Sequence, residues 1–295
     1  MTVHVSDDDA IDTAAARAFT EEFGDRATRL PPVAIVIAAF NEEGAIGPVV
    51  EGLPATVGGL DAVAIVVSDG SVDATIKEAR EAGALVCDAP VNRGQGAALR
   101  LGYRLAREGG ARYIVTTDAD GQYNPAEIES LIAPILAGQA DFVTGSRTLG
   151  SEETKDPVRK LGVRVFALMI SVLTGQRITD TTFGLRAMRA EVTGAVLLEQ
   201  PQYQASELLI GVITHGFRVA ERPATIHRRQ IGKSKKGNNA RYALSFAKVV
   251  LGTWWRERRR RRGPAARPAG DGPAAPGQLA DGVTACGPGA ARARD

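Results

Sequence analysis

Short apolar segments alternate with segments of helical periodicity between residues 33 and 144, and this regular alternation leaves few folds open. A strand buried on both faces is apolar throughout, whereas a helix that covers it is apolar on one face only. Alternation of the two indicates a mostly parallel sheet flanked by helices, so we predict an α/β fold. The strands are expected at 33–38, 63–67, 84–86, 113–116 and 141–144, and the helices at 43–52, 73–83, 96–108 and 125–137.

Composition divides the 295-residue chain into four parts. Residues 1–32 form a polar, alanine-rich N-terminal extension, for which we expect at most a loose helix. Residues 33–237 form a single globular domain, and residues 238–262 form an amphipathic helix with a basic end. Residues 263–295 consist mainly of Pro, Gly, Ala and Arg. Because so few large apolar side chains cannot offset the entropy lost on ordering, we predict a disordered tail.

Charge and cysteine content exclude several classes of protein. A formal net charge of +2 and an aromatic content of 5% do not favour a nucleic-acid partner. Cys87 and Cys286 are too far apart for a metal knuckle or a disulfide framework, which favours a reducing cytoplasm. The acidic first residues are unlike a secretory signal. The longest apolar segments, 163–173 and 243–255, each contain a basic residue and are shorter than the roughly 18 to 20 residues that span a bilayer, so we expect no integral membrane protein.

Two carboxylates follow the fourth predicted strand directly. Asp118 and Asp120 repel each other in the sequence TTDADGQYNP, so a positive group is expected beside them. A calcium loop would need Gly where Tyr123 stands, and a helix rather than a strand before it. Carboxylate oxygens instead suit a hard divalent cation, Mg²⁺ or Mn²⁺, that takes its other ligands from substrate phosphates. The competing interpretation is a solvated turn in which Asn124–Pro125 starts the next helix.

Polar residues also follow the other predicted strands. Since ligands of parallel sheets bind beyond the carboxyl ends of the strands, we expect Asp69, Asp73 and Arg147 to lie near the carboxylate pair. Asp73 has a plainer alternative as the cap of the next helix. The sequence has no Walker lysine motif, which argues against nucleoside-triphosphate hydrolysis. Gly94 and Gly96 in NRGQGAALRLG lack the full dinucleotide fingerprint, so we interpret them as a tight helix entry.

Seven motifs occur in an order that resembles the inverting family 2 glycosyltransferases, which have the GT-A fold. They are IVIAAFNEEGAI, VSDGSVDAT, TDADGQYNP, GSR, VRKLG, DTTFGLRAMR and RRQIGKSK, and the resemblance covers residues 33 to about 240. Within that family the order is similar to the polyprenyl-phosphate mannosyl and glucosyl synthases of the dolichol-phosphate type. The resemblance implies a metal-dependent enzyme that moves a sugar from a GDP- or UDP-sugar to a polyprenyl phosphate.

The same resemblance implies roles for individual residues. Asp120 and Gln122 bind the metal ion, with Asp118 as a further candidate ligand. Arg147 and Arg159 contact the acceptor phosphate and, with Asp120, are the catalytic candidates. The nucleotide-sugar is bound by Ala38, Phe40, Glu42, Val67, Asp69, Asp118, Ala119, Asp120, Arg229 and Lys235.

The implied reaction displaces a nucleoside diphosphate from the anomeric carbon of the sugar. Negative charge grows on the leaving group, and a metal ion, Arg229 and Lys235 would stabilise it there. The segment IGKSKKGNN is then a loop that orders over bound phosphates, or else an ordinary solvated loop. A lipid phosphate is already anionic near neutral pH and needs no strong base. A hydroxyl acceptor does need one, and Glu207 is the candidate for it.

Two departures from the family pattern leave the donor open. Ala38 stands where the family usually has Pro, and Ser68 stands where it usually has a second acidic residue. Two further functions also remain. One is a family 2 enzyme that acts on a soluble or secondary-metabolite hydroxyl, and the other is an inactive, membrane-associated protein that binds nucleotide-sugars.

The predicted last helix suggests contact with a membrane. Residues 241–262 place Trp254 and Trp255 before a segment that holds six arginines. Tryptophan favours the headgroup boundary, and each arginine near an anionic surface contributes on the order of 1 kcal/mol. We therefore expect peripheral docking at the cytoplasmic face of an anionic membrane. The alternative is a last helix packed on the core, with only its basic end in solvent.

Overall fold

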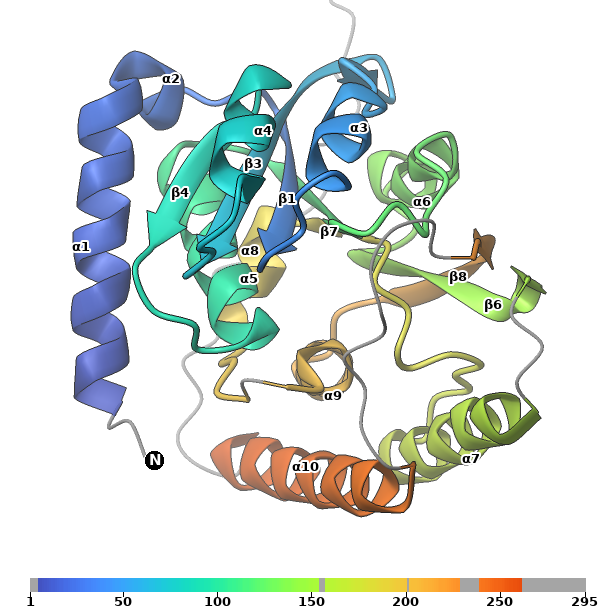
Figure 1. Cartoon of the computed structure of the whole chain (residues 1–295). Helices are drawn as coiled ribbons and strands as arrows, with labels where there is room; N and C mark the ends of the chain where they lie inside the picture. Colours follow the sequence, from blue (N-terminus) through green and yellow to red (C-terminus); the bar gives the residue numbers. More distant parts are fainter. Residues whose placement is uncertain (1–4, 154–156, 201, 229–238, 262–295) are drawn as a thin grey trace, which may run out of the picture. The chain divides into compact units, whose positions relative to one another are not determined.

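A mixed sheet of eight strands lies at the centre of the described structure (Figure 1). The computed structural model describes residues 5–153, 157–200, 202–228 and 239–261, which fall in one unit, Met1–Gly263. The strands are β1 Val33–Ala39, β2 Thr56–Val57, β3 Leu60–Asp69, β4 Leu85–Ala89, β5 Tyr113–Asp118, β6 Phe142–Glu152, β7 Arg186–Arg189 and β8 Val219–Ile226. Their order is β2-β3-β1-β5-β7-β6-β8, with β4 also paired to β3. All pairs are parallel except those of β2 and β7, so the predicted mostly parallel sheet is confirmed.

Both faces of the sheet are covered by helices. Along β1, Ala34 and Val36 belong to one hydrophobic cluster, whereas Val33, Ile35 and Ile37 belong to two others. This alternation follows from the period of two residues in a strand, and it explains why the segment is apolar throughout. The helices are α1 Val5–Phe23, α2 Asp25–Thr28, α3 Ile46–Glu51, α4 Thr75–Glu81, α5 Gln95–Glu108, α6 Glu127–Leu136, α7 Pro157–Thr174, α8 Ala190–Ala195, α9 Gln204–Thr214 and α10 Asn239–Arg261. The first cluster includes residues of α1, α5, α8, α9 and α10, and the other two include residues of α3, α4 and α6.

The five predicted strands and four predicted helices are confirmed with changes at their ends, and the largest change is in β6. We expected this strand to end before Gly145, but it continues to Glu152. Gly145 does not end the strand. Its missing side chain makes room for the ring of Phe183, because an added Cβ would lie 2.5 Å from a ring carbon. The strand pairs with β8 on both sides of a register shift between Ser146 and Ser151. Arg147 therefore lies within a strand rather than after one.

Two strands of the second half of the chain, β7 and β8, carry no signal that predicts them. β7 has the sequence RAMR, in which two arginines flank two residues, too short for a pattern to develop. β8 contains Glu221 and Pro223 and lies last in the strand order. Pro is tolerated at such an edge because its missing N–H leaves no ladder bond unmade.

The N-terminal extension is an ordered part of the same unit. Helix α1 lies along β4 (Figure 1), and Ala15, Ala16 and Phe19 on one face of it are buried in the largest hydrophobic cluster. The Sγ atom of Cys87, on β4, lies 3.7 Å from the carbonyl oxygen of Ala15. Alanines on this face allow the helix to approach the strand closely, so the alanine-rich composition of the segment serves packing.

The last helix combines a buried face with an exposed one. Phe246 and Val250 of α10 are fully buried, and the Phe246 ring stacks on that of Phe166 in α7 with centroids 3.8 Å apart. Leu251 and Trp255 are exposed by 49% and 53%. The core-packed alternative therefore describes one face of this helix only. In the parts of the chain that the structure describes, neither this helix nor another is both long and apolar enough to span a bilayer.

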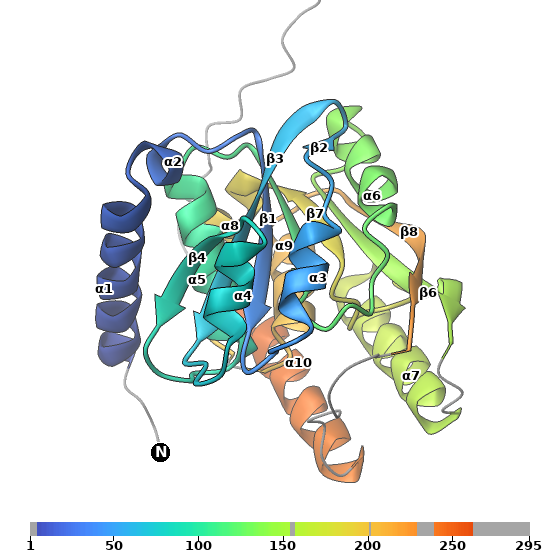
Figure 2. The ribbon, with the colours of Figure 1, turned by 45° about the horizontal axis from the view of Figure 1, so that its top comes forward.

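The carboxyl ends of the central strands face the helices that follow later in the chain. Figure 1 and Figure 2 both show the arrows of β1, β3 and β4 pointing toward the end of the unit where α7 and α10 lie. These two helices contact each other, and α9 contacts both. The loops that follow β1, β3 and β4 thus lie at the same end of the unit as α7 and α10.

Candidate functional site

The loop after β1 is held by the side chains that follow β3. The backbone N–H groups of residues 41–44 donate in order to Ser71 Oγ, Thr75 Oγ1, Asp73 Oδ2 and Glu78 Oε2, at 3.1, 2.8, 3.2 and 2.7 Å. Asn41 adopts a positive φ of 51° that allows its own side chain to accept a bond from Val72 N. Backbone groups that would otherwise need water are thus satisfied, and the two loops are fixed to each other.

Asp73 has both of the roles considered for it. Its Oδ1 accepts from the N–H of Thr75, the first residue of α4, so it holds the start of the helix although Ala74 is the capping position. Its Oδ2 accepts from Glu43 N in the neighbouring loop. Burial acts to raise the pKa of Asp73, but these hydrogen bonds outweigh it and the pKa is lowered.

Asp69 holds a third loop at the end of β3. Its carboxylate accepts from the backbone N–H groups of Arg93 at 3.0 Å and Gly94 at 2.7 Å. Burial raises the pKa of Asp69 above its ordinary value, and these two bonds oppose the rise. Gly70 beside it has a φ of +73°, and an added Cβ would lie 2.6 Å from Asn92 N. The approach of loop 91–94 therefore requires glycine at this position.

The remaining predicted nucleoside contacts differ in exposure. Val67 is fully buried and Ala119 nearly so, so their side chains offer little surface to a ligand. Ala38, Phe40 and Glu42 are half-buried at the end of β1. The second departure from the family pattern, Ser68, is also fully buried, and its Oγ accepts from Ser71 N at 3.3 Å.

The carboxylate pair lies at the end of β5, which pairs with β1 so that Asp118 is opposite Ala38. Asp118 Oδ1 accepts from the side-chain amide of Gln95, the first residue of α5, at 3.0 Å. Its Oδ2 occupies space that Gly184 leaves open, because a Cβ there would lie 2.6 Å from this oxygen. Asp120 is 8% exposed and accepts from Gln122 N at 3.1 Å. Asp120 is thus shielded from solvent, whereas Asp118 is only half-buried.

Tyr123 closes the site on one side. Its hydroxyl accepts from Gly184 N at 2.8 Å, and its ring lies against that of Phe183 with centroids 4.9 Å apart. Burial, and then the negative charge of Asp118, raise the pKa of the Tyr123 phenol well above its ordinary value. The phenol is thus a neutral wall beside the carboxylates rather than a base.

The donor set at this edge fits a hard divalent cation. Asp118 and Asp120 supply carboxylate oxygens, and Gln122 supplies an amide oxygen because its Nε2 donates to His227 O at 2.9 Å. Oxygen ligands of this kind suit Mg²⁺ or Mn²⁺. Within the described residues there is no group of three or more His, Cys, Asp or Glu side chains placed to hold an ion alone. A cation here would therefore share its coordination with a ligand.

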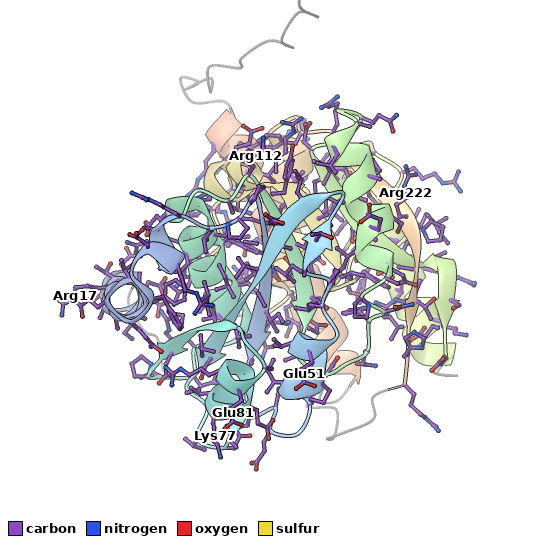
Figure 3. The ribbon with its side chains drawn as sticks, turned by 90° about the horizontal axis from the view of Figure 1, so that it is seen from above. Arg17, Glu51, Lys77, Glu81, Arg112 and Arg222 are labelled. Atoms are coloured by element: carbon purple, nitrogen blue, oxygen red, sulfur yellow. The ribbon has the colours of Figure 1, made fainter. Side chains whose placement is uncertain are left out.

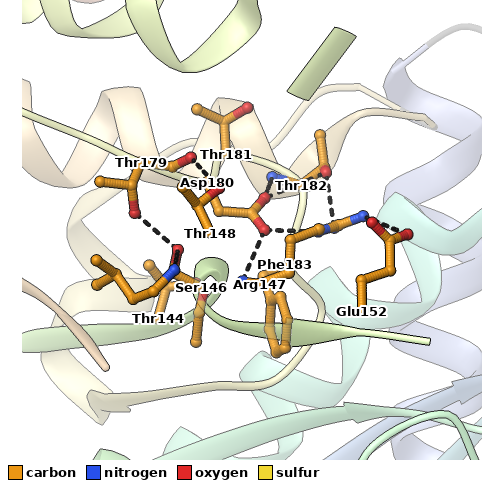
Figure 4. Close-up of polar contacts among 12 residues, drawn as sticks. Thr144, Ser146, Arg147, Thr148, Glu152, Thr179, Asp180, Thr181, Thr182 and Phe183 are labelled. Carbon is orange, nitrogen blue, oxygen red and sulfur yellow. Dashed lines mark hydrogen bonds and ion pairs between the residues drawn. The ribbon is translucent and has the colours of Figure 1, made fainter. Parts of the chain in front are cut away.

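Arg147 lies in a buried network on the other side of the site (Figure 4). Its Nε donates to Asp180 Oδ2 at 2.7 Å, and its Nη2 donates to Thr182 Oγ1 at 3.1 Å. Nη1 lies 3.8 Å from Glu152 Oε1. Burial acts to lower the pKa of the Arg147 guanidinium, but Asp180 and the other negative partners outweigh it and the pKa is raised. The guanidinium is thus a permanent, oriented positive charge.

The loop that carries Asp180 is itself held by an acidic side chain of β8. Glu221 accepts from the N–H groups of Thr179 and Asp180 at 2.9 and 3.0 Å. Burial raises the pKa of Glu221. Three elements far apart in the sequence, β6, the loop before β7 and β8, thus define the position of one arginine.

The chain segment that leads to the predicted lid is attached to the carboxylate loop. His227 N donates to Gln122 O at 2.9 Å, and His227 Nδ1 lies 2.9 Å from Glu153 Oε1. Arg228 N donates to the same carboxylate at 2.9 Å. Two of the predicted phosphate ligands, Arg229 and Lys235, lie outside the described residues, as does the tail 263–295 predicted to be disordered.

Two other predicted residues remain. Arg159 belongs to α7, and its side chain is outside the described part. Glu207 is fully buried, and its carboxylate accepts from the N–H groups of Glu199 and Gln200 and pairs with Arg256 Nη2 at 2.8 Å. Its proposed role as a base is therefore wrong, because all of its contacts are structural.

The sequence does not reveal the roles of three residues that build the site. Gln95 has a local signal in its place at a glycine-rich helix entry, but its partner Asp118 is 23 residues away. In the sequence Tyr123 only marks a departure from a calcium loop. Asp180 belongs to the motif DTTFGLRAMR, but its pairing with Arg147 spans 33 residues. Their roles depend on contacts that sequence spacing alone does not reveal.

Comparisons with known proteins identify the family of the chain. The family model described as Glycosyl transferase family 2 matches residues 34–197. A dolichyl-phosphate hexose transferase of Haloferax volcanii is 32% identical over 222 residues, which cover 74% of this chain and 94% of that protein. An undecaprenyl-phosphate mannosyltransferase of Micrococcus luteus is 30% identical over 219 residues, which cover 69% and 86%.

A solved structure confirms the expected fold. Glucosyl-3-phosphoglycerate synthase from Mycobacterium tuberculosis, crystallised with Mn²⁺, UDP and phosphoglyceric acid, superimposes with a TM-score of 0.60. The alignment covers 81% of this chain and 82% of that one at 20% identity. At this identity the likeness concerns the arrangement of strands and helices, which is that of the GT-A glycosyltransferases.

Proposed function

The chain belongs to glycosyl transferase family 2, and on that premise we propose that it transfers a sugar from a nucleoside diphosphate to a polyprenyl phosphate. The observation that carries the proposal is the carboxylate pair at the end of β5, the half-buried Asp118 and the buried Asp120, with the oriented Arg147 beyond Tyr123. The relatives described as acting on dolichyl and undecaprenyl phosphates support the choice of acceptor.

The donor side is proposed to bind the nucleotide-sugar at the ends of β1, β3 and β5. Asp118, Asp120 and Gln122 would hold a Mg²⁺ or Mn²⁺ ion, which when bound neutralises negative charge on the diphosphate. Phe40 and Glu42 line the loop beside Asp118 and offer partly exposed side chains to the nucleoside. The fixed backbone of this loop means that the ligand does not have to order it, which favours binding.

The acceptor side is proposed to use Arg147. Its Nε and Nη2 are held by Asp180 and Thr182, whereas Nη1 is buried, lies 3.8 Å from Glu152 Oε1 and has no hydrogen-bond partner within the described residues. A guanidinium fixed in this way offers its positive charge to an acceptor phosphate without losing further freedom. An anionic phosphate oxygen requires no proton removal before it attacks, in keeping with the structural use of Glu207.

A membrane surface is proposed to deliver the lipid. Leu161, Val165, Leu168 and Val172 follow one another at helical spacing along α7 and are exposed by 63%, 52%, 65% and 74%. Exposed apolar stripes of this size are uncommon on monomeric proteins. On α10, Trp255 is exposed and Arg259 stacks on it at 3.3 Å. Both helices lie at the end of the unit to which the strands point (Figure 2), so docking at the cytoplasmic face would bring the site to the lipid.

A transfer assay tests the proposal. Labelled UDP-glucose, UDP-N-acetylglucosamine and GDP-mannose are each incubated with the full chain and undecaprenyl phosphate, with Mg²⁺, with Mn²⁺ or with excess EDTA. The expected result is label in the organic phase from one donor, only with lipid and metal. Donor consumption that is independent of lipid would indicate a soluble acceptor. Donor binding without consumption under all conditions would indicate an inactive binding protein.

Vesicle flotation tests the docking surface. The full chain is expected to float with vesicles that contain phosphatidylglycerol at low salt, and the variant Leu168→Gln/Val172→Gln is expected to float less. Arg259→Glu should weaken flotation in the same way, whereas Lys77→Glu on the exposed face of α4 (Figure 3) makes the same charge change elsewhere and should not. Equal flotation of all four proteins would remove the membrane from the proposal.

A further inference from the structure

We propose that helix α1, which precedes the family match at residues 34–197, positions the donor site through Asp12 and Arg93. Asp12 is the positioning residue in this inference, and the segment 92–95, which ends with the first residue of α5, is the element that it holds. The consequence for donor binding rests on the proposed function, whereas the positioning of the loop does not.

Asp12 and Arg93 form a buried ion pair between α1 and the loop. Asp12 Oδ1 lies 2.7 Å from Arg93 Nη2, and the two side chains are exposed by only 6% and 4%. Arg93 Nη1 also donates to the carbonyl oxygen of Asp8, one turn earlier on α1, at 3.2 Å. The arginine side chain is thus fixed to two successive turns of the same helix.

The backbone and the next side chain of this loop serve the site directly. Arg93 N and Gly94 N both donate to the carboxylate of Asp69, and Gln95 Nε2 donates to Asp118. Three consecutive residues therefore connect α1, the end of β3 and the carboxylate pair. A shift of the Arg93 side chain would displace the amides on Asp69 and the amide on Asp118 together, because the three residues are consecutive in the chain.

Asp12 also holds the helix that follows the loop. Its Oδ2 accepts from Arg100 Nε at 3.2 Å, two turns into α5. One carboxylate thus fixes the loop at Arg93 and the helix axis at Arg100. Buried ion pairs contribute little net stability, because the cost of removing the charges from water offsets their attraction. Their directional bonds select one geometry, which is the contribution expected of a positioning residue.

A second observation allows the positioning of segment 92–95 by Asp12 to be distinguished from the mere packing of α1 on β4. Cys87 on β4 is fully buried against α1, with Sγ 3.7 Å from Ala15 O, and burial raises the pKa of its thiol to about 12. Detachment of α1 would expose this thiol. Its reactivity therefore reports on the packing of the helix independently of the loop.

The experiment compares Asp12→Asn with Glu21→Gln in the full chain, with Cys286→Ser in both so that Cys87 is the single thiol. Glu21 forms an exposed pair with Arg17 on the same helix, and Arg17 projects outward from it (Figure 3). Three properties are measured: amide hydrogen exchange of residues 92–95, reaction of Cys87 with a thiol reagent, and affinity for UDP and GDP in the presence of Mn²⁺.

We expect Asp12→Asn to speed exchange of the Arg93 and Gly94 amides about tenfold while Cys87 stays protected, and Glu21→Gln to change neither. The nucleotide that the unmutated chain binds should bind about tenfold more weakly to Asp12→Asn, and in turnover the KM for the donor should rise with kcat little changed. If Asp12→Asn does not fold, Asp8→Asn gives the same comparison, because the Asp8 carboxylate lies 3.5 Å from Arg93 and is 28% exposed.

Unchanged exchange in the variant would overturn the inference, as would faster exchange accompanied by a reactive Cys87, since the helix would then act only by being attached. Faster exchange with unchanged nucleotide affinity would overturn the link between α1 and the donor. If the unmutated chain binds neither UDP nor GDP, the proposed donor class fails, and the exchange data still decide whether Asp12 positions the loop.

Discussion

The two sides of the site are held together by different kinds of bond. On the donor side, at the ends of β1, β3 and β5, side chains accept hydrogen bonds from backbone N–H groups, as Asp73 and Asp69 do for Glu43 and Gly94. On the acceptor side, between β6 and β8, a buried arginine is held by a buried carboxylate, Arg147 by Asp180.

The difference has consequences for robustness. Each bond on the donor side is one of several parallel contacts between two loops, so the loss of one leaves the others. On the acceptor side, loss of one partner leaves an uncompensated charge in the interior, which costs much more than a neutral hydrogen bond. Supporting residues that only accept from backbone N–H groups, such as Asp73, should therefore tolerate substitution, whereas members of buried ion pairs should not: Asp180 on the acceptor side, and Asp12 where α1 meets the donor loop.

The largest expected effect concerns the carboxylates of the donor side that are proposed to hold the metal ion. Asp120→Asn should lower the rate of transfer about a thousandfold with an unchanged melting temperature, because the shape is kept and the charge on a metal ligand is lost. Asp61→Asn, the same change at an exposed position of β3, is the control. Near-normal turnover by Asp120→Asn, or full activity in excess EDTA, would contradict the metal assignment.

The next effect compares stability on the two sides. Asp180 is fully buried, and Asp180→Asn should lower the free energy of unfolding by about 3 kcal/mol, because it leaves the Arg147 charge without its main partner. Chemical denaturation measures this value. A loss below about 1 kcal/mol would mean that Glu152 and Thr182 are sufficient to hold the arginine.

The KM values for acceptor and donor should also distinguish the two sides of the site. Arg147→Lys and Arg159→Ala should each raise the KM for the acceptor about tenfold and leave the KM for the donor unchanged. Lysine lacks the planar fork of arginine, and alanine removes the positive charge altogether. Arg229→Ala should do the reverse. The opposite partition would exchange the acceptor and donor assignments of these residues.

The smallest effect is expected from the supporting bonds of the donor side. Asp73→Asn should lower the free energy of unfolding by about 1 kcal/mol, because asparagine accepts hydrogen bonds but carries no charge. The pKa of Asp73 is lowered by its hydrogen bonds, so its contribution is complete above the ordinary value of 3.8 and is lost as the pH falls through the lowered pKa. The two proteins should therefore converge in stability in acid. A difference that persists there would exclude the Asp73 charge as its cause.

Much of the donor side could be predicted because its signals are local. The apolar segment 33–38 and the carboxylates after 113–116 lie within single strand ends, and the rule that parallel strands bind ligands at their carboxyl ends brings them together. The acceptor side could not be predicted in the same way. β8 contains Glu221 and Pro223, and its membership of the sheet depends on the available edge of β6 rather than on its own pattern.

The sequence by itself determined the α/β architecture, the Asp118–Asp120 pair and the family, because periodicity and short motifs depend on neighbouring residues. Only the tertiary structure decided that Asp180 holds Arg147, that Glu207 is structural and that α1 reaches the donor loop through Asp12. These are pairings of charges across 33 to 81 residues of chain, and Glu207, which also accepts from nearby backbone N–H groups, pairs with Arg256 over 49 residues. A buried charge needs a partner, but many residues of opposite sign are available, and packing of the elements selects which of them is near.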